Sequence, residues 1–172
     1  VKTRSMLERE ISAEDLLNSL QYYKPQEISK HSDSLSDIEV QDHIDSMHDI
    51  SYTQQFSEEE IARHIEEIQK GELISVLFKE TNGFTNITII TKDSPSLLSK
   101  LCGVLSINDA NIHDARIFTR KDGIVIDTFN VTDFRTHSKL DPERYDKIER
   151  DFYAAITGMI QLNQEFKNMK SK

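Results

Sequence analysis

The spacing of hydrophobic residues between positions 86 and 131 predicts a strand, a helix and two further strands. Apolar and polar residues alternate over residues 87–91, with a period of two that indicates a strand covered on both faces. Residues 93–95 end this strand, because Pro95 has no N–H for a sheet hydrogen bond. A loop is therefore expected at residues 93–96.

Helical spacing begins directly after this loop. We expect the side chain of Ser94 or Ser96 to cap the helix and residues 108–111 to end it. Two β-rich runs follow, at 112–119 and 124–131, and the Asp-Gly pair between them is a hairpin signal. The apolar positions of the helix are Leu97, Leu98, Leu101, Val104 and Leu105.

A further strand is predicted upstream, at residues 73–80, where apolar and polar residues alternate. The pair Asn82-Gly83 then signals a tight turn, so this strand should lie antiparallel to the strand at 86–91. Near the C-terminus, Pro142 opens a helix whose apolar spacing continues beyond Gly158, and no β run follows it. This helix is expected either to be long or to be broken near Gly158. We expect residues 73–80 to fill the sheet edge that a final strand would otherwise occupy.

Helices are predicted before the sheet as well. Residues 56–71 carry the clearest pattern, with a capping box formed by Ser57 and Glu60 and with Gly71 after the last turn. Shorter helices are expected at 12–23 and 37–47. The polar stretch at 29–49 has few residues to bury, so we expect it either to be loosely held or to pair with another copy of the chain. The chain is therefore divided into a helical linker segment, 1–70, and an α+β domain, 71–172, with a long C-terminal helix.

A four-stranded sheet with helices on one face leaves its other face needing cover. We expect Ile90 and some of Val125, Phe129 and Val131 to point to that second face. A homodimer that pairs or stacks two sheets would cover this face, and the helical segment at 1–70 could instead cover its own sheet or that of a partner copy.

Composition narrows the function classes. Lys and Arg total 21 against 30 acidic residues, a net charge of -9, which argues against a nucleic-acid partner. No apolar run is long enough to span a membrane, and no signal peptide is recognisable. The single Cys102 cannot form an internal disulfide, in keeping with a cytoplasmic location. The chain starts at Val1, and we interpret it as part of something larger.

Candidate catalytic groups are few. His48-Asp49 with His43 nearby suggests a metal-dependent phosphohydrolase, but no matching ligand set accompanies them, so polar linker residues are the favoured interpretation. Cys102 with His113 would form a nucleophile pair, whereas the apolar neighbours of Cys102 favour a small core residue. The five glycines are scattered and make no phosphate loop. We expect no catalytic residue, no metal site and no cofactor.

The chain resembles an ACT domain, a small regulatory βαββαβ module, and more closely the ACT region of bacterial protein-PII uridylyltransferases. The resemblance covers roughly residues 50 to 132, and its carriers are 51–64, 93–97, 110–112, 114–119, 122–123 and 127–129. It implies a ferredoxin-like antiparallel sheet with helices on one face. It also implies that catalytic nucleotidyl-transfer domains, and the PII signalling protein as their partner, belong to a longer parent enzyme.

The resemblance further implies a binding site for a small amino acid, most plausibly glutamine, at an interface between two copies. The residues carried over are Asp93, Ser94, Pro95, Ser96 and Leu97 in the loop, Asn111 and Ile112 at the next strand, and Asn108 and Asp114 beside them. Free helix N–H groups would hold the carboxylate of the ligand. The alternative is a structural dimerisation module without a ligand, in which these residues only shape the turn and start the helix.

Two positions depart from the family pattern. Ser96 and Asp109 stand where the family usually has glycine, which lets the backbone of a neighbour or ligand approach closely. The side chain of Ser96 would therefore either block a ligand or offer it a hydroxyl.

Overall fold

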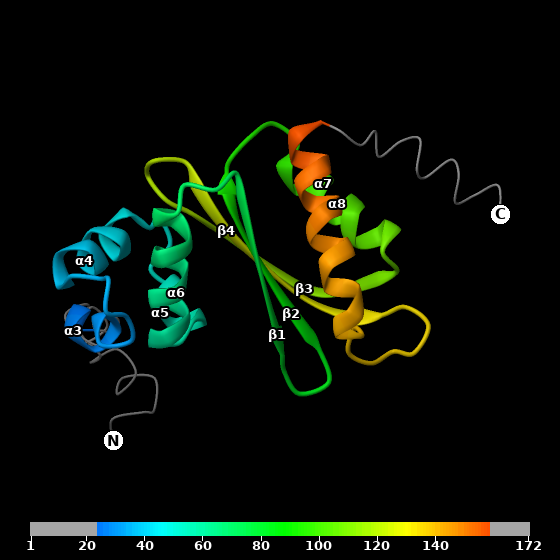
Figure 1. Cartoon of the computed structure of the whole chain (residues 1–172), viewed down its shortest axis with the longest axis horizontal. Coiled ribbons are helices and arrows are strands. Elements are labelled where there is room, and N and C mark those ends of the chain that lie inside the picture. The colour runs from blue at the N-terminus through cyan, green and yellow to red at the C-terminus, as the bar shows by residue number, and fades with distance from the viewer. Residues whose placement is uncertain (1–23, 159–172) are drawn as a thin grey trace, which may run out of the picture. The chain divides into compact units, whose positions relative to one another are not determined.

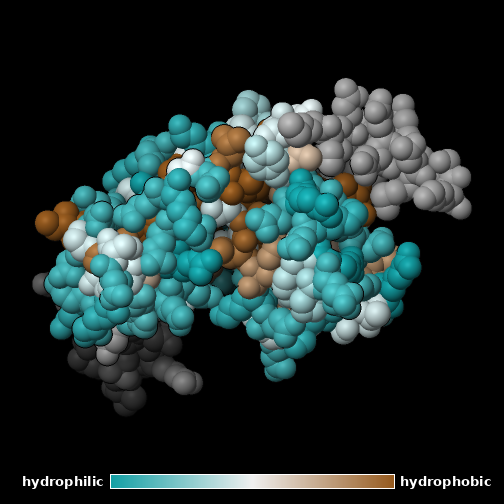
Figure 2. All heavy atoms as spheres, viewed as in Figure 1, coloured by the Kyte–Doolittle hydropathy of each residue, from teal (hydrophilic) through white to brown (hydrophobic). Residues whose placement is uncertain are grey.

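The computed structural model describes residues 24–158, and the chain divides into two compact units, residues 1–70 and residues 71–172. The first unit is helical and the second contains the sheet (Figure 1). Figure 2 shows that hydrophilic side chains cover most of the visible surface of the described residues, in keeping with the charged composition.

Four helices form the described part of the helical unit, and two of them begin with a capping box. The side chain of Ser57 accepts the backbone N–H of Glu60, whose carboxylate accepts the N–H of Ser57, as predicted; Ser36 and Glu39 form the same arrangement. The helices are α3 (Pro25–Ser29), α4 (Asp37–Ser46), α5 (Tyr52–Gln55) and α6 (Glu58–Gln69). The predicted helix at 12–23 lies outside the described residues.

The helical unit has a core of its own, to which the polar stretch at 29–49 contributes Leu35, Val40 and Met47. Ile28, Val40, Tyr52 and Ile61 are fully buried. Pro25 stands in the first turn of α3, where a missing N–H is harmless. Ile38 is 73% exposed, although it is one of the few apolar residues of its helix.

The sheet unit contains four antiparallel strands in the order β1-β2-β4-β3. Its elements are β1 (Ile74–Glu80), β2 (Thr85–Lys92), α7 (Leu97–Ile107), β3 (Ala110–Thr119), β4 (Ile124–Asp133), the short η2 (Pro142–Arg144) and α8 (Tyr145–Thr157). As predicted, β1 pairs with β2 and occupies the sheet edge. The result is a ferredoxin-like α+β fold whose edge strand comes from before the first βαβ segment.

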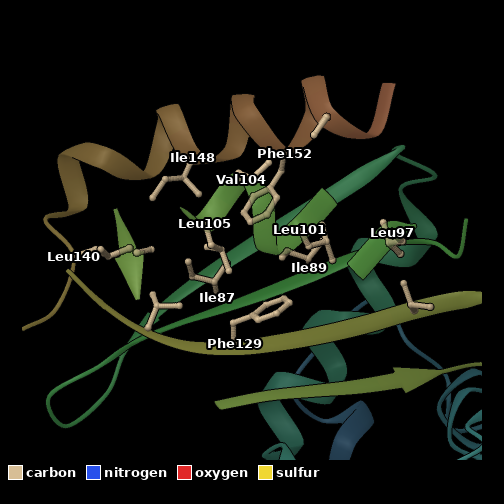
Figure 3. Close-up of a cluster of buried hydrophobic side chains, with 14 residues drawn as sticks. Ile87, Ile89, Leu97, Leu101, Val104, Leu105, Phe129, Leu140, Ile148 and Phe152 are labelled. Carbon is tan, nitrogen blue, oxygen red and sulfur yellow. The ribbon is translucent and has the colours of Figure 1, made fainter. Parts of the chain in front are cut away.

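Helices α7 and α8 lie on one face of the sheet (Figure 1). The side chains between these layers form the core, and Figure 3 shows helix residues such as Leu101 and Phe152 facing strand residues such as Ile89 and Phe129. Val125 and Val131 belong to this same core.

The second face of the sheet differs from the expectation. Val125, Phe129 and Val131 lie on the helix side, because residues two apart in a strand share a face. Ile90 does point to the opposite face, where its cross-strand partner is the fully buried Ile126.

The C-terminal helix begins as the sequence predicts, close to Pro142. Asp141 precedes it, and its carboxylate accepts the backbone N–H of Glu143. Gly158, with φ 76°, follows α8 in the left-handed conformation that commonly ends helices. The predicted continuation beyond Gly158 lies outside the described residues.

Candidate functional site

The loop between β2 and α7 is fastened at both ends by backbone hydrogen bonds. The N–H of Asp93 donates to the carbonyl of Gly123 at 2.8 Å, and the N–H of Leu97 donates to the carbonyl of Ser94 at 3.2 Å. Residues 93–96 are exposed, whereas Leu97 is buried in the core. The loop is therefore anchored by its ends and open to solvent along its length.

Neither predicted serine caps α7. Ser96 occupies the N-cap position with φ 63° and ψ 18°, and its side chain makes no capping bond. A serine caps best from an extended conformation, which the left-handed Ser96 does not have. Within residues 24–158, the backbone N–H groups of Leu98 and Ser99 have no hydrogen-bond acceptor. These two groups are available to an anionic ligand.

We expect Ser96→Gly to stabilise the sheet unit by about 0.5–1 kcal/mol, because the left-handed conformation strains every residue except glycine. Ser94→Gly is the matched control. The φ of Ser94 is not positive, so glycine there only increases the conformational entropy of the unfolded chain and should slightly destabilise the sheet unit. Thermal denaturation of both variants tests this, and equal effects would show that the strain at Ser96 is negligible.

The second departure from the family pattern also has a left-handed backbone. Asp109, immediately before β3, has φ 54°. Ser96 and Asp109, the two positions at which the resemblance implies glycine, thus both have a backbone conformation that favours glycine.

The remaining candidate residues lie at the other end of the sheet. Asn111 pairs with Thr132 and Asp114 with Asn130, whereas the loop at 93–97 follows the far end of β2, roughly 20–25 Å away along the strands. By their register, Ile112 faces the helices, and Asn111 and Asp114 face the opposite side. One copy of the chain does not bring the two groups together.

Asn108 is occupied by contacts within the fold. Its amide nitrogen donates to the carbonyl of Val104 at 2.9 Å and to the carboxylate of Asp151 at 3.0 Å, and its side-chain oxygen accepts from Lys147 at 3.1 Å. Its backbone carbonyl accepts a hydrogen bond from Arg144. These bonds join the end of α7 to the start of α8.

Asp127, on β4, is an acidic residue that the sequence analysis did not include among the candidate site residues. It lies on β4 with 2% of its surface exposed, and its Oδ1 atom is buried with no hydrogen-bond partner among the described residues. Burial, and then the charge of Asp93, raise the pKa of Asp127 to about 7. An aspartate within the apolar run of β4 was the available sequence signal.

Cys102 is half-buried on α7 and is the one cysteine of the chain. Burial, and then the charge of Asp127, raise the pKa of its thiol above the usual range, so the thiol stays protonated and unreactive. His113 lies on β3 with its Nε2 2.6 Å from the hydroxyl of Thr132. The structure thus shows no pairing of Cys102 with His113.

Two histidines are buried in the helical unit, and one of them, His43, was interpreted as a polar linker residue. His43 Nε2 lies 2.9 Å and His64 Nδ1 lies 2.7 Å from the hydroxyl of Tyr52, and the two histidines are 3% and 2% exposed. His48 is exposed. Burial lowers the pKa of His64 to about 4, against a smaller opposing effect of Glu60. A neutral, hydrogen-bonded histidine at this place is a core residue.

Within the described part of the chain, no group of three His, Cys, Asp or Glu side chains is arranged to hold a metal ion. Among the same residues, no helix has the length and apolar character needed to cross a membrane.

Together, the ferredoxin-like sheet, the open loop and the two free N–H groups define a small α+β domain with a candidate anion-binding helix start. No family model and no solved structure matches the chain. Curated proteins do match it, among them the bifunctional uridylyltransferase/uridylyl-removing enzymes of several bacteria.

The matches with these enzymes differ in length. The chain is 44% identical over 61 residues to the enzyme of Vibrio parahaemolyticus, which covers 36% of the chain and 7% of the relative. It is 33% identical over 82 residues to the enzyme of Gluconobacter oxydans, a match that covers 48% of the chain and 9% of the relative. It is 29% identical over 159 residues to the enzyme of Vibrio campbellii, a match that covers 90% of the chain and 17% of the relative.

The chain therefore spans less than a fifth of the length of these relatives. The matches confirm the resemblance to uridylyltransferases noted from the sequence, and they establish similarity to one segment of such an enzyme.

Proposed function

We propose that the chain is a regulatory ACT-type module of a uridylyltransferase/uridylyl-removing enzyme, which binds a small amino acid, glutamine, between two copies. The observation that carries the proposal is the division of the candidate residues between opposite ends of one sheet. A site built from both ends requires a second copy.

The edge of β3 supports such a pairing. Among the described residues, β3 pairs only with β4, and most of its residues are exposed. Thr119, the last residue of β3, pairs with Val125 of β4. Val125 also pairs with Thr91 of β2, close to the loop at 93–96. If two β3 edges pair antiparallel about a two-fold axis, the start of one strand meets the end of the other. Asn111 and Asp114 of the second copy then lie at the end of the sheet that carries Asp93.

The chemistry at the loop suits a zwitterion. The free N–H groups of Leu98 and Ser99 stand at the positive end of the α7 dipole and favour a carboxylate. Asp93, exposed in the same loop, adds negative charge that attracts an ammonium group to this end of the sheet. An α-amino acid carries both charges one carbon apart.

In the longer parent enzyme, ligand binding here would control the catalytic domains, whose partner is the PII signalling protein. Such control requires that the amino acid bind one state of the enzyme more tightly than another. The net charge of -9 argues against nucleic acid as a partner of the module.

Calorimetric titration of the 172-residue chain with L-glutamine tests the proposal. Saturable heat at millimolar glutamine, absent with D-glutamine, is the expected result. If no heat is seen while the chain is a dimer, the alternative, a dimerisation module without a ligand, takes its place. If the chain is monomeric and silent, both proposals fail.

The dimer itself is tested by Ile117→Lys. Ile117 is 46% exposed on the free edge strand, where lysine opposes edge-to-edge pairing. Sedimentation should show that the dimer dissociation constant rises by about tenfold or more. Tyr153→Lys is the matched control, since Tyr153 is 45% exposed but belongs to helix α8 and not to the edge strand β3. Equal weakening by both variants would contradict pairing through β3.

A further inference from the structure

Asp127 lies on β4, on the face of the sheet that the helices cover. Its cross-strand partner Ile89 belongs to the core beneath α7, so the carboxylate of Asp127 faces the same helix. The charge of Asp93 in the loop contributes to the raised pKa of Asp127, and the charge of Asp127 contributes to the raised pKa of the Cys102 thiol in α7. The strand register therefore puts the carboxylate on the α7 side of the sheet, in a locally acidic environment.

Nothing in the described part of the chain neutralises this carboxylate. No Lys, Arg or His among residues 24–158 forms an ion pair with it, and Oδ1 accepts no hydrogen bond. A buried charged group left without a partner is strongly unfavourable, and such groups concentrate at functional sites. The adjacent acidic group, Asp93, makes the local charge more negative still.

We infer that Asp127 is the residue that receives the α-ammonium group of the amino acid ligand, at the base of the site whose rim is the loop at 93–97. The inference rests on the proposed function and adds a specificity-determining residue to it. The ligand carboxylate would occupy the free N–H groups of Leu98 and Ser99, and its ammonium would donate to Oδ1 of Asp127.

Because Asp127 is 2% exposed, the inference requires the loop at 93–96 to move when the ligand binds. Residues 93–96 are exposed and are held by the two backbone bonds at Asp93 and Leu97. When the ammonium enters, the carboxyl of Asp127 must be ionised. At neutral pH it is about half protonated, so binding should release about half a proton.

The test compares L-glutamine with glutaramate, which is glutamine without its α-ammonium group, on the wild-type chain and on Asp127→Asn. We expect the wild type to bind glutamine at least about tenfold more tightly than glutaramate, and the variant to lose most of this preference. Calorimetry in two buffers of different ionisation enthalpy should detect proton release with the wild type alone. Asp146→Asn, an exposed aspartate on α8, is the control that should retain both behaviours.

Two results would overturn the inference in distinguishable ways. If both proteins prefer glutamine equally, Asp127 does not receive the ammonium, although the proposed function stands. If the wild-type chain binds neither compound, the proposed function fails, and the role of Asp127 fails with it.

Discussion

Asp127→Asn should stabilise the sheet unit by about 2–4 kcal/mol at mildly alkaline pH. The folded-state pKa of Asp127, about 7, lies above its usual 3.8, so folding favours the protonated carboxyl. The resulting stability is lost as the pH rises from about 4 to about 7, because the buried group must then ionise without a partner. Asparagine keeps the shape of the side chain and removes the charge.

Hydrogen exchange of the β2 and β4 amides, followed by mass spectrometry, reports on this unit separately from the helical unit. From about pH 5 to about pH 8, the wild type should lose about 2–3 kcal/mol of protection free energy beyond the loss in Asp127→Asn. Asp146→Asn should follow the wild type. Parallel pH profiles for Asp127→Asn and the wild type would show that the carboxylate is solvated. If Asp127→Asn is more stable than the wild type but has a weaker preference for glutamine over glutaramate, Asp127 lowers stability and serves binding.

The helical unit should respond to pH in the opposite sense. His64 has a folded-state pKa of about 4, below its usual 6.5, because its ring is buried and bonded to Tyr52. The neutral ring is favoured in the fold, so stability is complete above the usual pKa and is lost as the pH falls toward 4. Between about pH 7 and about pH 5 we expect a loss of about 2 kcal/mol.

Hydrogen exchange of the α6 amides measures this loss of stability. The groups that act on His64 are Glu60 and the hydroxyl of Tyr52, which is also in hydrogen-bond contact with His43. His48→Gln removes an exposed histidine of the same unit and should leave the profile unchanged. An α6 whose protection does not change over this pH range would mean that protonated His64 is accommodated in the fold.

The strands, both capping boxes and the position of β1 at the sheet edge follow from local patterns. The pair Asn82-Gly83 fixes the antiparallel pairing of β1 with β2, and Ser57 with Glu60 fixes the start of α6. These signals depend on residues close in sequence, and for this reason they can be read without a structure.

The interior assignments needed tertiary information. Val125, Phe129 and Val131 share a face with one another, but the sequence of β4 is apolar on both faces and does not say which one meets the helices. His43 and His64 are buried because Tyr52, from a third helix, supplies a hydroxyl to both. Ser96 was expected to cap α7, and its left-handed backbone is set by the loop rather than by its own preference.

The candidate ligand residues were carried over from a resemblance, and the geometry of one chain separates them. Residues 93–97 and Asn111 lie at opposite ends of the sheet, and antiparallel pairing of two β3 edges is what would reunite them. The loop and the start of β3 would then report on the same binding event.

Nuclear magnetic resonance mapping of the isotope-labelled chain tests this most directly. On titration with L-glutamine, amide resonances of residues 93–99 and of residues 111–114 should shift together with a single dissociation constant. Shifts in one group alone, or no shifts in either group at saturating glutamine, would contradict a shared site between two copies.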